Sequence, residues 1–106
     1  MFESFLAQPQ VTAGEMLQIA QFYLQVGQAN RAVTIVEQAT QRFPQDGEPF
    51  YALAILRGAN GATNEALAAL EKAIQLNSAL RERARGDQNM ASLRANVRFQ
   101  ALVTGP

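Results

Sequence analysis

The chain has 106 residues, of which 48% are hydrophobic and 17% are charged, and its formal net charge at pH 7 is zero. This composition is that of one ordinary globular domain, and the balanced charge argues against a dedicated nucleic-acid binder. The chain has no cysteine and no histidine, which excludes disulfides, thiolate metal sites and any catalytic triad built on histidine.

Membrane insertion and export are not indicated by the sequence. No apolar run approaches the roughly 20 residues that a membrane-spanning helix needs. The first residues also lack the basic and long apolar regions of a signal peptide. We therefore expect a cytoplasmic location by default, although a protein without cysteine would function equally well in the periplasm.

Residues 1–12 form an N-terminal segment in front of the first regular pattern. Three large apolar side chains, Phe2, Phe5 and Leu6, could lie on one short helix, with residues 8–10 as a linker. These side chains could dock into an apolar groove of the same chain or of a second copy.

Residues 13–46 show the signals of two consecutive helices. Thr12 followed by Glu15 has the spacing of a capping box, and Gly27 suits the residue after a helix end. Between them, apolar side chains recur at spacings of three and four: Met16, Leu17, Ile19, Ala20, Tyr23 and Leu24. A second helix is predicted from about Asn30 until Pro44 stops it.

The same pattern starts again in residues 47–80. The turn 46–49 leads into a third helix whose apolar face consists of Phe50, Leu53, Ala54 and Leu56. Gly58 and Gly61 bracket the end of that helix, and Thr63 is predicted to be the N-cap of the fourth. This fourth helix should end near Asn77.

The two halves superpose at one constant shift along the sequence. The matching pairs are Ile19 with Leu53, Ala20 with Ala54, Gly27 with Gly61, Ala32 with Ala66, and Ala39 with Ala73. A period of about 34 residues with two helices in each period is typical of stacked helical hairpins.

Residues 13–46 and 47–80 resemble two tetratricopeptide repeats. The resemblance rests on the small residues of both helices, on the aromatic Tyr23 and on the closing Pro44. The second repeat departs from the family pattern at Arg57 and Ser78, and Met16 and Phe50 stand where a tryptophan is typical. The resemblance implies an all-α solenoid of two antiparallel helix hairpins.

Residues 81–106 are interpreted as a helical C-terminal cap. A short helix should run from Ala79 to Arg85, and Asp87 could cap the helix after it. A terminal repeat must hide the apolar face of the last hairpin. The tail also carries Arg81, Arg83, Arg85, Arg94 and Arg98. We favour a solvated helix face for these arginines over a site for phosphate or an acidic peptide.

The resemblance also implies how the chain functions. In this family the first helices of successive repeats line a concave groove, which here would present Leu17, Gln21, Leu24, Tyr51 and Ile55. We expect at least Leu17 and Tyr51 to be exposed there and to bind a protein or peptide.

Two alternatives remain open. The chain could be a self-association domain that forms a homodimer, or a regulatory tail of a larger enzyme or membrane protein. No residues of the sequence suggest a catalytic, cofactor-binding or metal site, so an enzyme is not expected.

Overall fold

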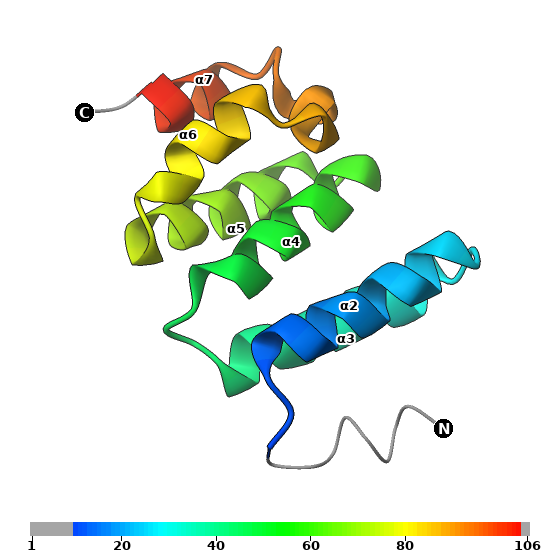
Figure 1. The fold of residues 1–106 in the computed structure, drawn as a ribbon. Helices are drawn as coiled ribbons and strands as arrows, with labels where there is room; N and C mark the ends of the chain where they lie inside the picture. The colour runs from blue at the N-terminus through cyan, green and yellow to red at the C-terminus, as the bar shows by residue number, and fades with distance from the viewer. Residues whose placement is uncertain (1–9, 105–106) are drawn as a thin grey trace.

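A computed structural model of the chain describes residues 10–104 and shows an all-helical fold (Figure 1). The first four helices are α2 (Ala13–Gln25), α3 (Ala29–Arg42), α4 (Gly47–Ala59) and α5 (Thr63–Leu76). They are followed by α6 (Ala79–Gly86), the short 3-10 helix η1 (Gln88–Leu93) and α7 (Val97–Thr104). Residues 10–104 contain no strand. The short helix expected near the N-terminus lies outside the described residues.

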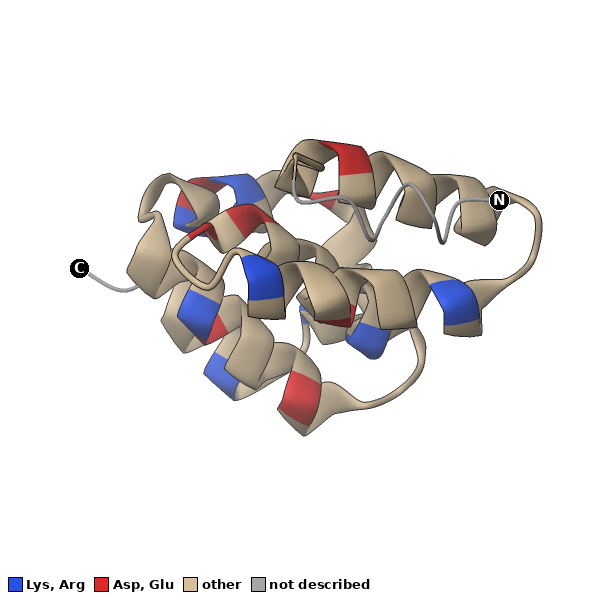
Figure 2. Ribbon diagram, turned by 90° about the horizontal axis from the view of Figure 1, so that it is seen from below, with Lys and Arg blue, Asp and Glu red and all other residues tan. Residues whose placement is uncertain are grey.

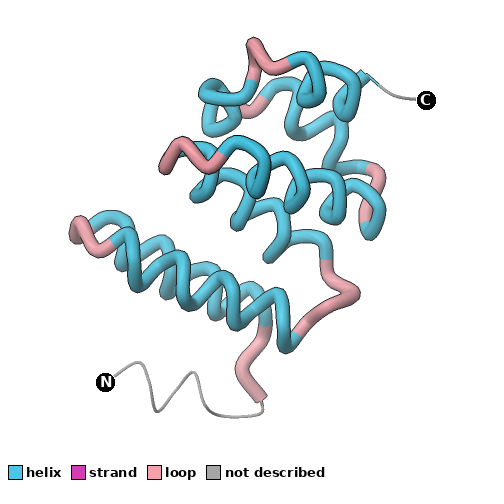
Figure 3. The backbone as a smooth tube through the Cα atoms, turned by 180° about the vertical axis from the view of Figure 1, so that it is seen from behind, coloured by secondary structure: helices cyan, strands magenta, loops and turns pink. Residues whose placement is uncertain are grey.

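The helices form two stacked hairpins and a third, irregular layer. Helix α2 packs against α3 and α4 packs against α5, while α3 and α4 join the two hairpins (Figure 3). Helices α6, η1 and α7 lie over the second hairpin, on the side away from α2 (Figure 1). The all-α solenoid predicted from the sequence is therefore confirmed.

The first helix begins as the sequence predicts. The Thr12 hydroxyl accepts a hydrogen bond from the Glu15 backbone N–H at 3.1 Å, and the Glu15 carboxylate accepts one from the Thr12 N–H at 2.9 Å. This capping box satisfies two of the backbone donors that a helix start leaves free. Helix α4 begins in a related way, because the Asp46 carboxylate accepts from the Glu48 N–H at 3.0 Å.

The turn inside each hairpin has the same backbone geometry. Gly27 and Gly61 both have φ of 81°, in the left-handed region that favours glycine. The next residue closes the turn in both hairpins: the Gln28 N–H donates to the Tyr23 carbonyl at 2.8 Å, and the Ala62 N–H donates to the Arg57 carbonyl at 2.9 Å. This is the hydrogen bond of a Schellman motif.

The Schellman turn explains why Thr63 is not the N-cap that the sequence predicts. The residue that closes the turn is also the residue directly before the next helix. Ala62 therefore occupies the N-cap position, without a side-chain hydrogen bond, and Thr63 is already helical. Gln28 has the same double role before α3 and likewise makes no side-chain cap.

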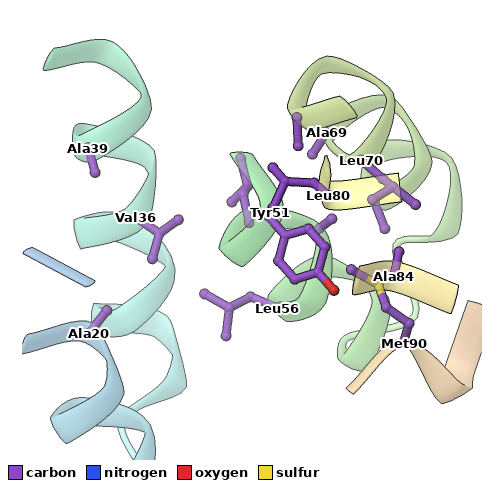
Figure 4. Close-up of a cluster of buried hydrophobic side chains, with 14 of the residues drawn as sticks. Ala20, Val36, Ala39, Tyr51, Leu56, Ala69, Leu70, Leu80, Ala84 and Met90 are labelled. Atoms are coloured by element: carbon purple, nitrogen blue, oxygen red, sulfur yellow. The ribbon is translucent and has the colours of Figure 1, made fainter. Parts of the chain in front are cut away.

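The core combines alanine side chains at the points where two helices cross with larger apolar side chains around those points. The matched alanines are all buried: Ala20, Ala32, Ala39, Ala54, Ala66 and Ala73. Figure 4 shows Val36 of α3 and Leu56 of α4 on the sides of these helices that face each other. Alanine at such a contact lets two helices approach at the short end of the 8–10 Å range.

The alanine contacts give a direct test of the packing. Replacing Ala66 with leucine should lower the free energy of unfolding by about 1–3 kcal/mol, because the larger side chain overpacks the buried contact. Ala68 lies on the same helix but is exposed, so Ala68→Leu should change stability by only about 0.5 kcal/mol. Urea denaturation of both variants measures the difference, and equal stabilities would contradict this packing.

Candidate interaction surface

The five residues proposed to bind a partner lie on the first helices of the two hairpins. Leu17, Gln21 and Leu24 are on α2, while Tyr51 and Ile55 are on α4. Gln21 is exposed. The apolar side chains of Leu17, Leu24 and Ile55 are half-buried and pack against the core, so each keeps part of its surface accessible.

Tyr51 differs from the expectation of an exposed groove residue. It is only 4% exposed, and its hydroxyl donates a hydrogen bond to the Asp87 carboxylate at 2.7 Å. The Arg83 guanidinium carbon lies 5.3 Å from the centre of the ring, close enough for a cation–π interaction. The prediction that Tyr51 is exposed is therefore wrong, because the C-terminal layer covers it.

Asp87 links the second repeat to the C-terminal layer. One carboxylate oxygen accepts from Tyr51, and the other accepts from the Asn89 backbone N–H at 2.9 Å. Asp87 thus caps η1, the role that the sequence indicated for it. The same carboxylate holds the first turn of η1 and the buried tyrosine of α4.

The environment shifts the pKa of both groups. Burial, reinforced by the hydrogen bond to Asp87, raises the pKa of the Tyr51 hydroxyl far above its usual value. Burial alone would raise the pKa of Asp87, but the hydrogen bonds from Tyr51 and Asn89 and the nearby Arg83 outweigh it. The pKa of Asp87 is therefore lowered.

The C-terminal layer also covers the far end of α4. Gly58 is the counterpart of Leu24 in the second repeat. A Cβ atom at Gly58 would lie 3.1 Å from the Ser92 hydroxyl oxygen and 3.4 Å from the Leu93 side chain. A side chain of ordinary size at this position would force η1 away from α4. Of the five residues proposed to bind a partner, Tyr51 is thus covered by the C-terminal layer, whereas Leu17, Gln21, Leu24 and Ile55 are at least partly accessible.

Two arginines of the tail bind carbonyl groups at the end of α7. Arg81 Nε donates to the Leu102 carbonyl at 3.1 Å, and Arg85 Nε donates to the Val103 carbonyl at 2.6 Å. Carbonyls in the last turn of a helix have no partner within the helix, and a cation there also complements the helix dipole. These two contacts fix α7 onto α6.

The other three arginines of the tail also find acceptors within the chain. Arg94 donates to the carbonyls of Arg85 and Asp87, both at 2.7 Å. Arg83 pairs with Glu48 at 2.8 Å, and Arg98 with Glu71 at 3.5 Å. The two ion pairs are half-exposed, so each adds little stability. Arg83 and Arg98 thus join the tail to its own repeats, whereas Arg94 binds within the tail, and neither hypothesis from the sequence includes these roles.

Charged residues of both signs are interspersed along the helices (Figure 2). Within residues 10–104 no three acidic side chains come together as a metal site would require. None of the helices in this part of the chain has the length and apolar character needed to cross a bilayer.

The lowered pKa of Asp87 predicts how stability depends on pH. A carboxyl with a depressed pKa in the folded state stabilises the fold above its unfolded pKa, near 4, and this contribution disappears as pH falls through the folded pKa. The Tm of the wild type should therefore exceed that of Asp87→Asn at pH 7, and the gap should narrow below about pH 4. Thermal melts followed by circular dichroism measure the gap, and a gap independent of pH would refute this role for the charge.

Comparison with known proteins identifies the repeats. The family model for the tetratricopeptide repeat matches the chain twice, at residues 16–46 and 48–80. A search of curated proteins found no match, and a search of solved structures found none. Tetratricopeptide repeats generally mediate protein–protein interactions. Because the two matches cover more than half of its length, the chain belongs to the tetratricopeptide repeat family.

Proposed function

We propose that this chain is a protein-binding module that takes a peptide or helix of its partner on the accessible concave side of α2. The observation that carries the proposal is the arrangement of Leu17, Gln21 and Leu24. Their spacing of four and three residues puts them on one helical face, with exposed Gln21 between two half-buried leucines. Ile55 of α4, the counterpart of Gln21 in the second repeat, is also half-buried and packs against the core.

The chemistry of this surface favours an apolar partner. The only charged residue of α2 is Glu15, and its carboxylate already accepts the hydrogen bond from Thr12. The surface therefore offers partly exposed leucine and isoleucine side chains together with glutamine amides. An amphipathic helix that presents its apolar face is the ligand that fits.

The size of the surface limits the affinity. The second repeat contributes Ile55, whereas Tyr51 and Gly58 lie beneath the C-terminal layer. A contact confined to one helix and one neighbouring side chain buries less than the roughly 800 Å² per partner of a standard interface. We expect weak binding by a single copy, and stronger binding where several copies act together.

The substitution Gln21→Arg tests the proposal without disturbing the core. Peptides selected from a displayed library against the wild type would be measured by fluorescence anisotropy against each variant. Gln21→Arg should weaken binding by about tenfold or more, equivalent to about 1.4 kcal/mol, because it places a charge in an apolar contact. Gln41→Arg makes the same change at an exposed position of α3 and should bind like the wild type.

The outcome also separates the rival functions. If Gln21→Arg and Gln41→Arg bind the peptides with equal affinity, binding at this surface is contradicted. A selection that yields no peptide with affinity for the wild type would contradict it as well. If sedimentation shows that the wild type is a dimer and that Gln21→Arg is a monomer, the surface serves self-association.

A further inference from the structure

A second apolar surface lies on another side of α2. Phe22 is 46% exposed and Val26 is 51% exposed, and Val26, the C-cap residue directly after α2, lies one turn beyond Phe22. Exposed Gln18 and Gln25 flank them. We call these four residues the outer face of α2. None of the four carries a charge, which is unusual for the exposed side of a helix in a globular protein.

The internal repeat shows what covers the corresponding face in the second hairpin. Leu56 is the counterpart of Phe22 in the second repeat and is only 7% exposed. It lies on the side of α4 that faces Val36 of α3 (Figure 4), and α3 and α4 are in contact. The corresponding side of α4 is therefore buried by the helix that precedes it in the stack. No described helix precedes α2.

We propose that residues 2–6 of the same chain pack on the outer face of α2, in the place that α3 takes against α4. The segment supplies Phe2, Phe5 and Leu6, whose spacing of three and one residues would put them on one side of a helical turn. The segment carries one charged residue, Glu3, and the outer face carries none. Packing the apolar side chains of the segment on α2 therefore takes no charge of the outer face out of water.

The length of the chain before Gln10 is sufficient for this contact. The distance along the helix axis from Thr12 to Phe22 is about 15 Å, at about 1.5 Å per residue. With residues 2–6 in a helical turn and residues 6–10 extended, the stretch from Phe2 to Gln10 spans roughly 19 Å. The segment can therefore turn back before α2 and still place its aromatic side chains beside Phe22 and Val26.

The covalent link favours the segment over a second copy of the chain. A short tether gives the segment an effective concentration in the millimolar range at the outer face. A separate molecule would need to reach that concentration to compete with an equal contact. This inference does not depend on the proposed function, which concerns Gln21 and its neighbours.

Cross-linking tests the contact directly, because the chain has no cysteine of its own. Ser4→Cys would be combined with Gln18→Cys in one variant and with Gln25→Cys in another, and each treated with a short bismaleimide. The control combines Ser4→Cys with Gln100→Cys, which is exposed on α7 at the other end of the molecule. Mass spectrometry after proteolysis identifies the linked peptides.

The expected result is an intramolecular cross-link in at least one outer-face variant, formed on the order of tenfold faster than in the control. Cross-links between two molecules would show that a second copy occupies the face and would overturn the proposal. Rates equal to the control in both outer-face variants would overturn it as well.

Thermal stability gives a second, independent readout. Val26→Ser should lower the Tm by a few degrees, and combining it with Phe5→Ser should add little to that loss, because both changes remove the same contact. The control is Val97→Ser on α7, where the native side chain is 79% exposed, and its Tm should not change. If Val26→Ser behaves like Val97→Ser, the proposal is wrong.

Discussion

The close approach of paired helices at buried alanines is the constraint on which the rest of this structure depends. Ala20 and Ala32 occur in the first hairpin and recur at the matching positions of the second hairpin as Ala54 and Ala66. The matching alanines allow the two helices of each hairpin to pack closely. The two hairpins stack with one helix of each in contact, which places α4 against α3. The same stacking brings the first helices of the two hairpins, α2 and α4, into contact.

The C-terminal layer ends the stack by a different set of interactions. It buries apolar side chains of its own, which are Leu80, Met90, Leu93, Phe99 and Val103, and polar contacts add to this packing. Asp87 accepts a hydrogen bond from the buried hydroxyl of Tyr51 in the second repeat, whereas within the layer Arg81 and Arg85 donate to carbonyl groups at the end of α7. A short helix has a high proportion of unpaired end groups. Arginine is suited to this position because its long side chain reaches a neighbouring helix and donates several hydrogen bonds. The layer can therefore be built from helices of eight residues or fewer.

The sequence was informative wherever a signal acts over a few residues. The capping box at Thr12, the left-handed glycines and the repeat period are local or repeated patterns, and each predicted the structure correctly. The burial of Tyr51 could not be found in this way, because its partner Asp87 is 36 residues away. The acceptors of Arg81 and Arg85 are backbone carbonyls, which have no signature in the sequence. Thr63 was assigned wrongly because the Schellman turn, and not a side chain, decides where α5 begins.

The turn inside each hairpin restricts how repeats of this kind can change in length. Because Gln28 and Ala62 each end one helix and begin the next, these turns contain no residue that could be lost or duplicated without effect. One extra residue within the following helix would rotate its buried face by about 100° and move the alanines away from the contact. In the connection between α3 and α4, no single residue both ends one helix and begins the next, because Phe43 ends α3 and Asp46 precedes α4. Insertions and deletions in related chains should therefore accumulate between the hairpins, so that whole hairpins are gained or lost as units.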